Sequence, residues 1–96
     1  MRPSEALAAH RDQLRELVGK YDVRRPRVFG SVLTGADTEG SDLDLLVDRG
    51  EATTLFTIAG LEHQAGELLG CPVSVLTPAF LPVKFRETVL REARLL

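Results

Sequence analysis

Two short stretches decide the fold: Val28-Phe29-Gly30-Ser31 and Ser41-Asp42-Leu43-Asp44-Leu45-Leu46-Val47. Residues 27–29 predict a short strand that opens after Pro26 and ends in a turn at Gly30-Ser31. Residues 43–47 are an apolar run interrupted by a single acid, which is typical of a buried strand. Between them, residues 34–41 have the composition of a loop. The sequence therefore predicts two strands, with polar residues where the first ends and the second begins.

Helical patterns flank these strands on both sides. The helices and strands are expected, in chain order, at residues 4–18, 27–29, 43–47, from Thr53 or Thr54 to Gly70, 72–77, and from Pro82 to about Ala93. Ser4 is the expected N-cap of the first helix, and the apolar positions of the last helix are Phe85, Val89 and Leu90. The order α-β-β-α-β-α predicts one small α/β (α+β) domain over residues 1–96, with a mixed sheet covered by helices mainly on one face.

The composition is ordinary for a soluble protein. Twelve Lys and Arg residues against 14 Asp and Glu residues give a net charge of −2. A general affinity for DNA or RNA, which needs a basic face, is therefore not expected. The single cysteine, Cys71, rules out an internal disulfide and suits a reducing compartment. The first residues lack the apolar core of a signal peptide, and no apolar run is long enough to span a membrane. We expect a cytoplasmic protein.

Asp42 and Asp44 give the first indication of chemistry. Alternation along a strand places both carboxylates on one face, where a divalent cation such as Mg²⁺, shared with substrate phosphates, relieves their repulsion. Gly30 lets a phosphate approach the backbone without a Cβ in the way, and the Ser31 hydroxyl and turn N–H groups can donate to an anion. Either motif alone is common, but the four residues at this spacing arise by chance in about 1 in 1,000 chains of this length. The pattern predicts a nucleotide triphosphate site.

These residues resemble the G-S-x10-D-x-D signature of the DNA polymerase β-like nucleotidyltransferase superfamily. The length, the helix-first order and the closing segment resemble its minimal nucleotidyltransferase (MNT) group, and the resemblance covers nearly the whole chain. It implies a polymerase β-like fold and an antitoxin that transfers AMP from ATP to a tyrosine of a HEPN-domain toxin. It also implies that Gly30, Ser31 and Ser41 bind the nucleotide phosphates, and that Asp42 and Asp44 are catalytic and bind two Mg²⁺ ions.

Two positions depart from the family pattern. Ser74, within Val73-Ser74-Val75-Leu76-Thr77, stands where the family has a third carboxylate, which helps to hold the metal beside the attacking hydroxyl and can accept its proton. Val32-Leu33-Thr34 replaces a segment in which many relatives carry arginines, so less positive charge lies near the phosphates. Asp48 cannot readily replace the missing acid, because it lies about 13 Å from Asp44 at the rise of a strand.

Several other charged residues lie near these motifs without a defined role. Asp37 and Glu39 are on the loop, from which their side chains could reach the site. Arg24, Arg25 and Arg27 form the only dense basic cluster. We expect a solvated basic turn there, with guidance of a phosphate or an acidic partner as the alternative.

The sequence leaves two functions open. In the first, the chain is a Mg²⁺- and ATP-dependent enzyme that modifies its toxin partner. In the second, the loss of the acid at Ser74 has ended catalysis, and the chain neutralises its partner by masking it, with ATP as a structural ligand. Apolar helix faces that so small a domain leaves uncovered would be available for a homo- or hetero-oligomeric contact in either case.

Overall fold

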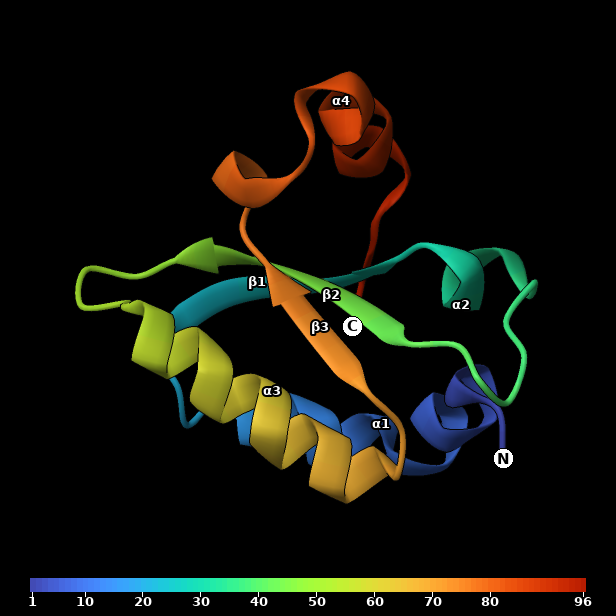
Figure 1. The fold of residues 1–96 in the computed structure, drawn as a ribbon. Helices are drawn as coiled ribbons and strands as arrows, with labels where there is room; N and C mark the ends of the chain where they lie inside the picture. Colours follow the sequence, from blue (N-terminus) through green and yellow to red (C-terminus); the bar gives the residue numbers. More distant parts are fainter.

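The computed structural model covers all 96 residues and forms one sheet with helices on both faces (Figure 1). Its elements are α1 (Pro3–Val18), β1 (Val23–Phe29), α2 (Ser31–Thr34), β2 (Leu43–Arg49), α3 (Leu55–Leu69), β3 (Val73–Leu76), the 3₁₀ turn η1 (Pro78–Phe80), α4 (Val83–Glu92) and β4 (Arg94–Leu95). The strands lie in the order β3-β2-β1-β4, with β2 parallel to β3 and β1 antiparallel to both β2 and β4. The mixed sheet confirms the predicted fold class.

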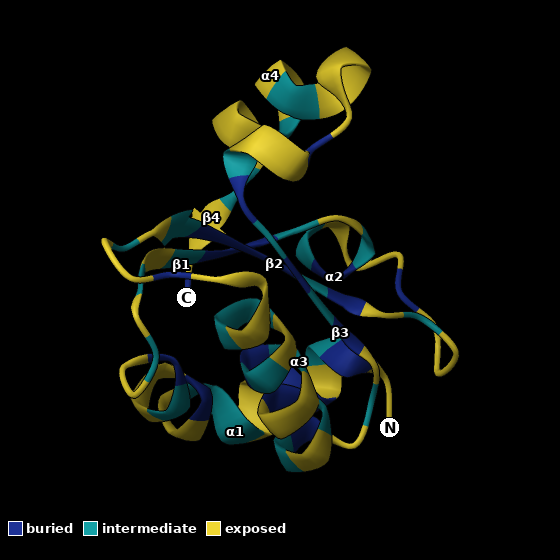
Figure 2. Cartoon of the chain, turned by 60° about the vertical axis from the view of Figure 1, so that its left-hand side comes forward, coloured by how far each residue is buried: buried dark blue, intermediate teal, exposed yellow.

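The core lies between the sheet and the layer formed by α1 and α3, whereas α4 lies over the other face (Figure 1). Leu43, Leu45 and Val47 of β2 are fully buried together with helical residues such as Leu61. Because these residues alternate along β2, Asp44 and its neighbours at every second position face the α4 side. Figure 2 shows the contrast, since the strands and inner helix faces are buried and α4 is largely exposed.

β1 is longer than predicted, because it continues through Pro26 back to Val23. Its pairing with β2 shifts register between Arg24 and Arg27, and Arg25 between them has a φ of +50°. A bulge of this kind leaves part of the strand unpaired, which accommodates the missing N–H of proline. The strand that the sequence predicts after Pro26 is therefore only the second half of β1.

Arg27 does not belong to a solvated basic turn, so this prediction is wrong for that residue. Arg27 is 7% exposed, its Nη2 donates to Asp48 Oδ1 at 2.5 Å, and its Nε donates to the carbonyl oxygen of Arg25 at 2.9 Å. Arg24 and Arg25 remain exposed. Asp48 therefore forms an ion pair with Arg27 near the C-terminal end of β2, whereas Asp44 lies near the other end of the strand.

The predicted N-cap is correct for α3 but not for α1, whereas Gly19 ends α1 as predicted. Thr54 caps α3 by accepting a hydrogen bond from the first turn, and Gly70 ends the helix in the left-handed conformation. α1 begins at Pro3 rather than after Ser4, and the N–H of Ser4 donates to the side chain of Asp37. A side chain from another segment therefore takes the role that the sequence assigns to a local N-cap.

Three short elements, α2, η1 and β4, are not predicted, because four, three and two residues are too few for a periodic pattern. The apolar positions predicted for the last helix are also more exposed than expected, with Phe85 56% and Leu90 41% exposed. No helix in the structure combines the length and the apolar character needed to cross a membrane.

Candidate nucleotide site

Phe29, Asp44 and Ser74 lie side by side across three strands. Phe29 of β1 pairs with Asp44 of β2, and Asp44 pairs in turn with Ser74 of β3. Because directly paired residues of neighbouring strands point to the same face, all three side chains lie on the face that α4 overlooks. The residue at the predicted third-carboxylate position, Ser74, is therefore the immediate neighbour of Asp44.

Asp44 is half-buried, and Asp42 lies just before β2 with an exposed side chain. Burial and, to a smaller degree, the negative charge of Asp42 raise the pKa of the Asp44 carboxyl above its ordinary value. No Lys or Arg occurs between Val28 and Asp48 to compensate these charges locally. The acid pair is an anionic centre whose environment favours a bound cation.

Gly30 connects the Gly30-Ser31 turn to the acid pair formed by Asp42 and Asp44. It follows β1 and precedes α2 with φ +79° and ψ −153°, a region of backbone conformation that is essentially restricted to glycine. A Cβ on Gly30 would lie 2.5 Å from Oδ2 of Asp44, so a larger residue would displace that carboxylate. The Gly-Ser turn and the second acid of the Asp-x-Asp motif are therefore in direct contact.

Ser31 and Ser41 have different surroundings. Ser31 is the first residue of α2, a position at which helix geometry leaves the backbone N–H without an intrahelical partner. Ser41 Oγ accepts a hydrogen bond from the N–H of Thr38 at 2.9 Å, which closes a turn in the loop before β2. The Ser41 hydroxyl thus takes part in loop structure, whereas Ser31 lies next to Gly30. Phosphate binding by either serine stays a prediction.

The two loop acids are engaged with the N-terminal segment of the chain. Asp37 is 3% exposed, and its Oδ2 accepts a hydrogen bond from the Ser4 N–H at 2.8 Å. This hydrogen bond lowers the pKa of the Asp37 carboxyl. Glu39 Oε1 lies 3.4 Å from the ammonium group of Met1. Asp37 anchors the loop between the two motifs to α1, a role that sequence reasoning missed because the partner is a backbone group 33 residues away.

The donor set fits one Mg²⁺ ion better than two. Asp42 and Asp44 supply carboxylate oxygens, which Mg²⁺ prefers, and substrate phosphates and water complete such sites. The structure has no group of three or more His, Cys, Asp or Glu side chains placed to share a metal ion. The neighbour of Asp44 on the next strand is the neutral Ser74. A second ion beside an attacking hydroxyl would therefore lack its carboxylate ligand.

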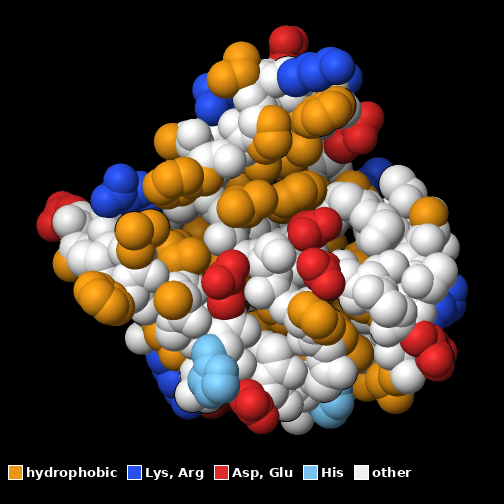
Figure 3. Space-filling model, in the orientation of Figure 1, with side chains coloured by type: hydrophobic (Ala, Val, Ile, Leu, Met, Phe, Trp, Pro, Cys, Tyr) orange, Lys and Arg blue, Asp and Glu red, His pale blue; other side chains and the backbone are white.

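A cleft of about 410 Å³ opens between α4 and the sheet. Phe29, Gly30 and Leu76 line it from the sheet side, and Leu81 and Phe85 line it from the segment that leads into α4 and from α4 itself. Figure 3 shows hydrophobic side chains gathered over this part of the molecule, with acidic side chains next to them. We call this hollow the α4 cleft.

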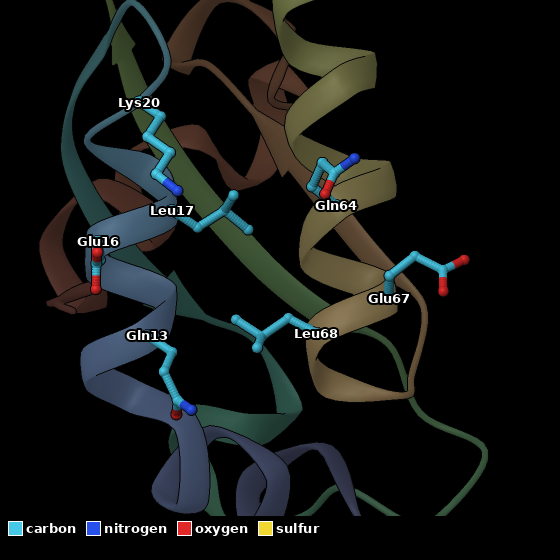
Figure 4. Close-up of a pocket in the computed structure, with 7 residues that line it drawn as sticks. All are labelled: Gln13, Glu16, Leu17, Lys20, Gln64, Glu67 and Leu68. Carbon is cyan, nitrogen blue, oxygen red and sulfur yellow. The ribbon is translucent and has the colours of Figure 1, made fainter.

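A separate groove lies between α1 and α3, in the layer that covers the other face of the sheet (Figure 4). Leu17 and Leu68 point into the space between the helices, and polar side chains such as Gln13 and Lys20 also line the groove. None of its lining residues belongs to the nucleotide motifs. The α4 cleft, in contrast, shares Gly30 with those motifs.

The chain matches the nucleotidyltransferase domain family over residues 7–96 and belongs to that family. Within the family it is a minimal nucleotidyltransferase. It is 40% identical over 86 residues to the protein adenylyltransferase MntA of Thermococcus cleftensis, a match that covers 90% of this chain and 84% of that protein. A solved structure of a protein assigned as a minimal nucleotidyltransferase aligns with a TM-score of 0.82 at 42% identity, over 94% of this chain and 92% of the other.

The same fold occurs in a toxin–antitoxin crystal structure with AMP-PNP. One of its chains aligns with a TM-score of 0.74 at 15% identity, covering 88% of this chain and 69% of that chain. At this identity the likeness shows a common fold. Together with the family match, it confirms the predicted nucleotidyltransferase fold.

Proposed function

We propose that this chain is a cytoplasmic antitoxin that transfers AMP from ATP to a hydroxyl group, specifically a tyrosine, of a HEPN-type toxin. The observation that carries the proposal is the contact between Gly30 and Asp44, which joins a phosphate turn and an acid pair in one site. Similarity to a protein adenylyltransferase over most of both chains supports the chemistry. Toxin–antitoxin structures that share the fold support the choice of partner.

In this function the chain's own residues bind and orient the nucleotide. Gly30 and Ser31 receive the triphosphate at the turn, Ser41 borders it from the loop, and Asp42 and Asp44 hold Mg²⁺ against the phosphates. Bound Mg²⁺ would neutralise phosphate charge and support the departure of pyrophosphate. The raised pKa of Asp44 is consistent with this role, because a cation favours the ionised carboxylate that burial and Asp42 disfavour.

The enzyme proposal is tested directly by incubating the chain with the purified toxin, Mg²⁺ and ATP labelled at the α-phosphate. The measurement is the labelled AMP that becomes attached to the toxin. The wild-type chain is expected to label the toxin, and an Asp42→Asn/Asp44→Asn double variant is expected to lose this activity. Asp12→Asn is a matched control, because Asp12 is an exposed acid on α1 that forms an ion pair with Arg15 of the same helix and lies outside the candidate site. Equal labelling by the wild type and the double variant would exclude chemistry at this site.

Masking without chemistry is the second candidate function, and Ser74 is the observation that favours it. The neighbour of Asp44 on β3 is the neutral Ser74, so no third carboxylate is available there to take the proton of an attacking hydroxyl. If masking suffices, the Asp42→Asn/Asp44→Asn variant should still rescue cells that express the toxin. Loss of rescue by a variant that folds and binds the toxin would instead favour transfer of AMP.

A further inference from the structure

We propose that Glu62 of α3 takes the proton of the acceptor hydroxyl during transfer of AMP, a proposal that rests on the proposed function. Glu62 Oε2 accepts a hydrogen bond of 2.8 Å from the backbone N–H of Val75 in β3. Val75 directly follows Ser74, the neutral neighbour of Asp44. A carboxylate from a helix therefore lies next to the strand position that has none of its own.

Glu62 reaches the outer edge of the sheet. β3 is an edge strand that pairs with β2 on one side only, and α3 runs beside it (Figure 1). One strand spacing of about 4.8 Å separates β3 from the strand that carries Asp44. The hydrogen bond to Val75 places the Glu62 carboxylate beyond β3, so Asp44, Ser74 and Glu62 follow one another across the sheet. A hydroxyl group over the small side chain of Ser74 would have one acid on either side.

The Glu62 carboxylate is available to accept a proton. It takes part in none of the ion pairs of the structure, and its hydrogen bond to Val75 uses Oε2 and leaves Oε1 open. The residue is only partly buried. Glu62 does not join Asp42 and Asp44 in a group of three acids placed to share a metal ion. These observations favour a role with the proton and not with the metal.

Covering the edge of β3 does not explain the charge of Glu62. An edge N–H needs only an oxygen acceptor, and the neutral amide of glutamine supplies one. A carboxylate one strand beyond Asp44 adds negative charge near an acid pair that already repels its own charges. A residue with edge capping as its single role would therefore be more favourable as glutamine. Proton transfer, in contrast, requires the carboxylate.

The transfer step places the incoming and leaving groups on opposite sides of Asp44. The hydroxyl oxygen forms a bond to the α-phosphorus of ATP while the bond from that phosphorus to the bridging oxygen of the β-phosphate breaks. Pyrophosphate leaves with the electron pair of the broken bond, and the hydroxyl proton passes to Glu62 Oε1. The attacking and leaving oxygens lie roughly in line through the phosphorus. The Gly30 turn, where pyrophosphate is proposed to bind, follows β1, and Glu62 lies beyond β3.

Glu62→Gln separates proton acceptance from edge capping, because the glutamine amide oxygen still accepts the Val75 N–H but takes no proton. With saturating toxin, ATP and Mg²⁺, the single-turnover rate of AMP transfer is expected to fall at least about 100-fold. Hydrogen exchange at the Val75 amide is the structural measurement, and it should stay slow in Glu62→Gln. Glu62→Ala should lose both the rate and the protection of this amide.

Two further variants complete the experiment. Glu67→Gln removes the same charge from an exposed glutamate of α3, five residues further along the helix and therefore on a different face (Figure 4). This control should transfer AMP at the wild-type rate. Ser74→Asp in the Glu62→Gln background should raise the rate at least about 10-fold, because it returns a proton acceptor to the adjacent strand position.

Three results would overturn the role of Glu62. One is a wild-type rate in Glu62→Gln, and another is equal slowing in Glu62→Gln and Glu67→Gln, which would indicate an effect of total charge. The third is a failure of Ser74→Asp to raise the rate of Glu62→Gln, since the two positions would then not serve the same proton. Absence of AMP transfer by the wild type would instead reject the proposed function, and with it any proton acceptor.

Discussion

Gly30 lies so close to Asp44 that a Cβ on the glycine would stand 2.5 Å from the carboxylate oxygen Oδ2. Gly30 directly follows β1, and Asp44 lies in the neighbouring antiparallel strand β2, where it pairs with Phe29, the last residue of β1. The register of the sheet, and not the intervening loop, therefore fixes the distance between the Gly30-Ser31 turn and the acid pair. The short spacing in sequence between the two motifs reflects a hairpin-like return of the chain.

Replacing Gly30 by alanine should disturb both the backbone and the acid. The residue occupies a conformation in which a side chain is strained by about 1–3 kcal/mol, and the added methyl group would push the Asp44 carboxylate aside. We expect Gly30→Ala to lower the free energy of unfolding by that amount and to weaken Mg²⁺-ATP binding at least about 10-fold, a change equivalent to about 1.4 kcal/mol. Urea unfolding and calorimetry measure the two effects.

Gly35→Ala is the matched control for this variant. Gly35 also has a positive φ, +74°, but a Cβ there would meet nothing within 4 Å. The control should lose about 1–2 kcal/mol of stability through backbone strain and keep its ATP affinity. Equal loss of ATP binding in both variants would show that backbone strain, and not the contact with Asp44, governs the site.

The stability of the nucleotide-free chain should depend on the charge of Asp44. Burial and then Asp42 raise its pKa in the folded state, so folding favours the protonated acid. This contribution is fully present below the ordinary Asp pKa of about 3.9 and is lost as the pH rises through the raised value. Without Mg²⁺ at pH 7, Asp44→Asn is therefore expected to be more stable than the wild type.

The advantage of Asp44→Asn should shrink as the pH falls through the raised pKa of Asp44 and be nearly gone below about 4, because the wild-type carboxyl is then protonated in both the folded and the unfolded state. Urea unfolding at pH 7 and at pH 3.5 measures the difference. The exposed-acid variant Asp12→Asn is the control and should show no such gain in stability at pH 7. A less stable Asp44→Asn variant at pH 7 would contradict the physical account of the acid pair.

The local signals in the sequence predict the main elements correctly. A threonine cap and a glycine stop define α3, and the apolar run after Asp42 defines β2. What the sequence does not predict depends on contacts between distant segments. The sequence predicts Arg27 as part of a basic turn, because its partner Asp48 lies on a neighbouring strand. β4 has only two residues, and its position beside β1 depends on where α4 places the end of the chain.

The same distinction applies to the candidate site. Gly30, Ser31, Asp42 and Asp44 can be selected as candidates from the sequence alone, because these four residue types at this spacing rarely occur together by chance. The contacts between these residues could not be predicted from the spacing, because the short distance between Gly30 and Asp44 depends on the register of β1 and β2. The α4 cleft depends on the position of a helix whose sequence predicts a buried face but whose Phe85 is largely exposed.

Asp37 should stabilise the loop that connects the two motifs. Its carboxylate accepts a hydrogen bond from the Ser4 N–H, which lowers its pKa, so its contribution is present above the ordinary Asp pKa and is lost as the pH falls through the lowered value. We expect Asp37→Ala to lower the thermal midpoint at pH 7 and to speed hydrogen exchange at the Ser4 amide. The loss should be smaller at low pH.

Glu39→Gln is the control for the loop anchor. Glu39 lies on the same loop, but its contact with the Met1 ammonium group is exposed, with 80% of the Glu39 side chain accessible, and exposed pairs contribute little. The control should leave the thermal midpoint and the Ser4 exchange rate nearly unchanged. Similar effects of the two variants would mean that general loop charge, and not the Asp37 bond to α1, fixes the loop.

Ser74→Asp should restore a third carboxylate beside Asp44. The two residues are paired in the parallel register of β2 and β3, so the new carboxylate would lie next to the existing one on the same face of the sheet. Without Mg²⁺, repulsion between them should make Ser74→Asp less stable than the neutral control Ser74→Asn. Mg²⁺ should reverse this order, because an ion that binds only the folded state raises its stability.

The rate of AMP transfer provides the second measurement on these variants. If the missing acid limits catalysis, Ser74→Asp should increase transfer to the toxin by on the order of 10–100-fold, the range associated with one supporting group at a metal site. Ser74→Asn should not increase it, since an amide neither carries the charge nor accepts the proton. A Ser74→Asp variant that gains Mg²⁺-dependent stability without faster transfer would place the limiting step elsewhere. Unchanged stability and rate together would show that Ser74 does not lie at the metal position.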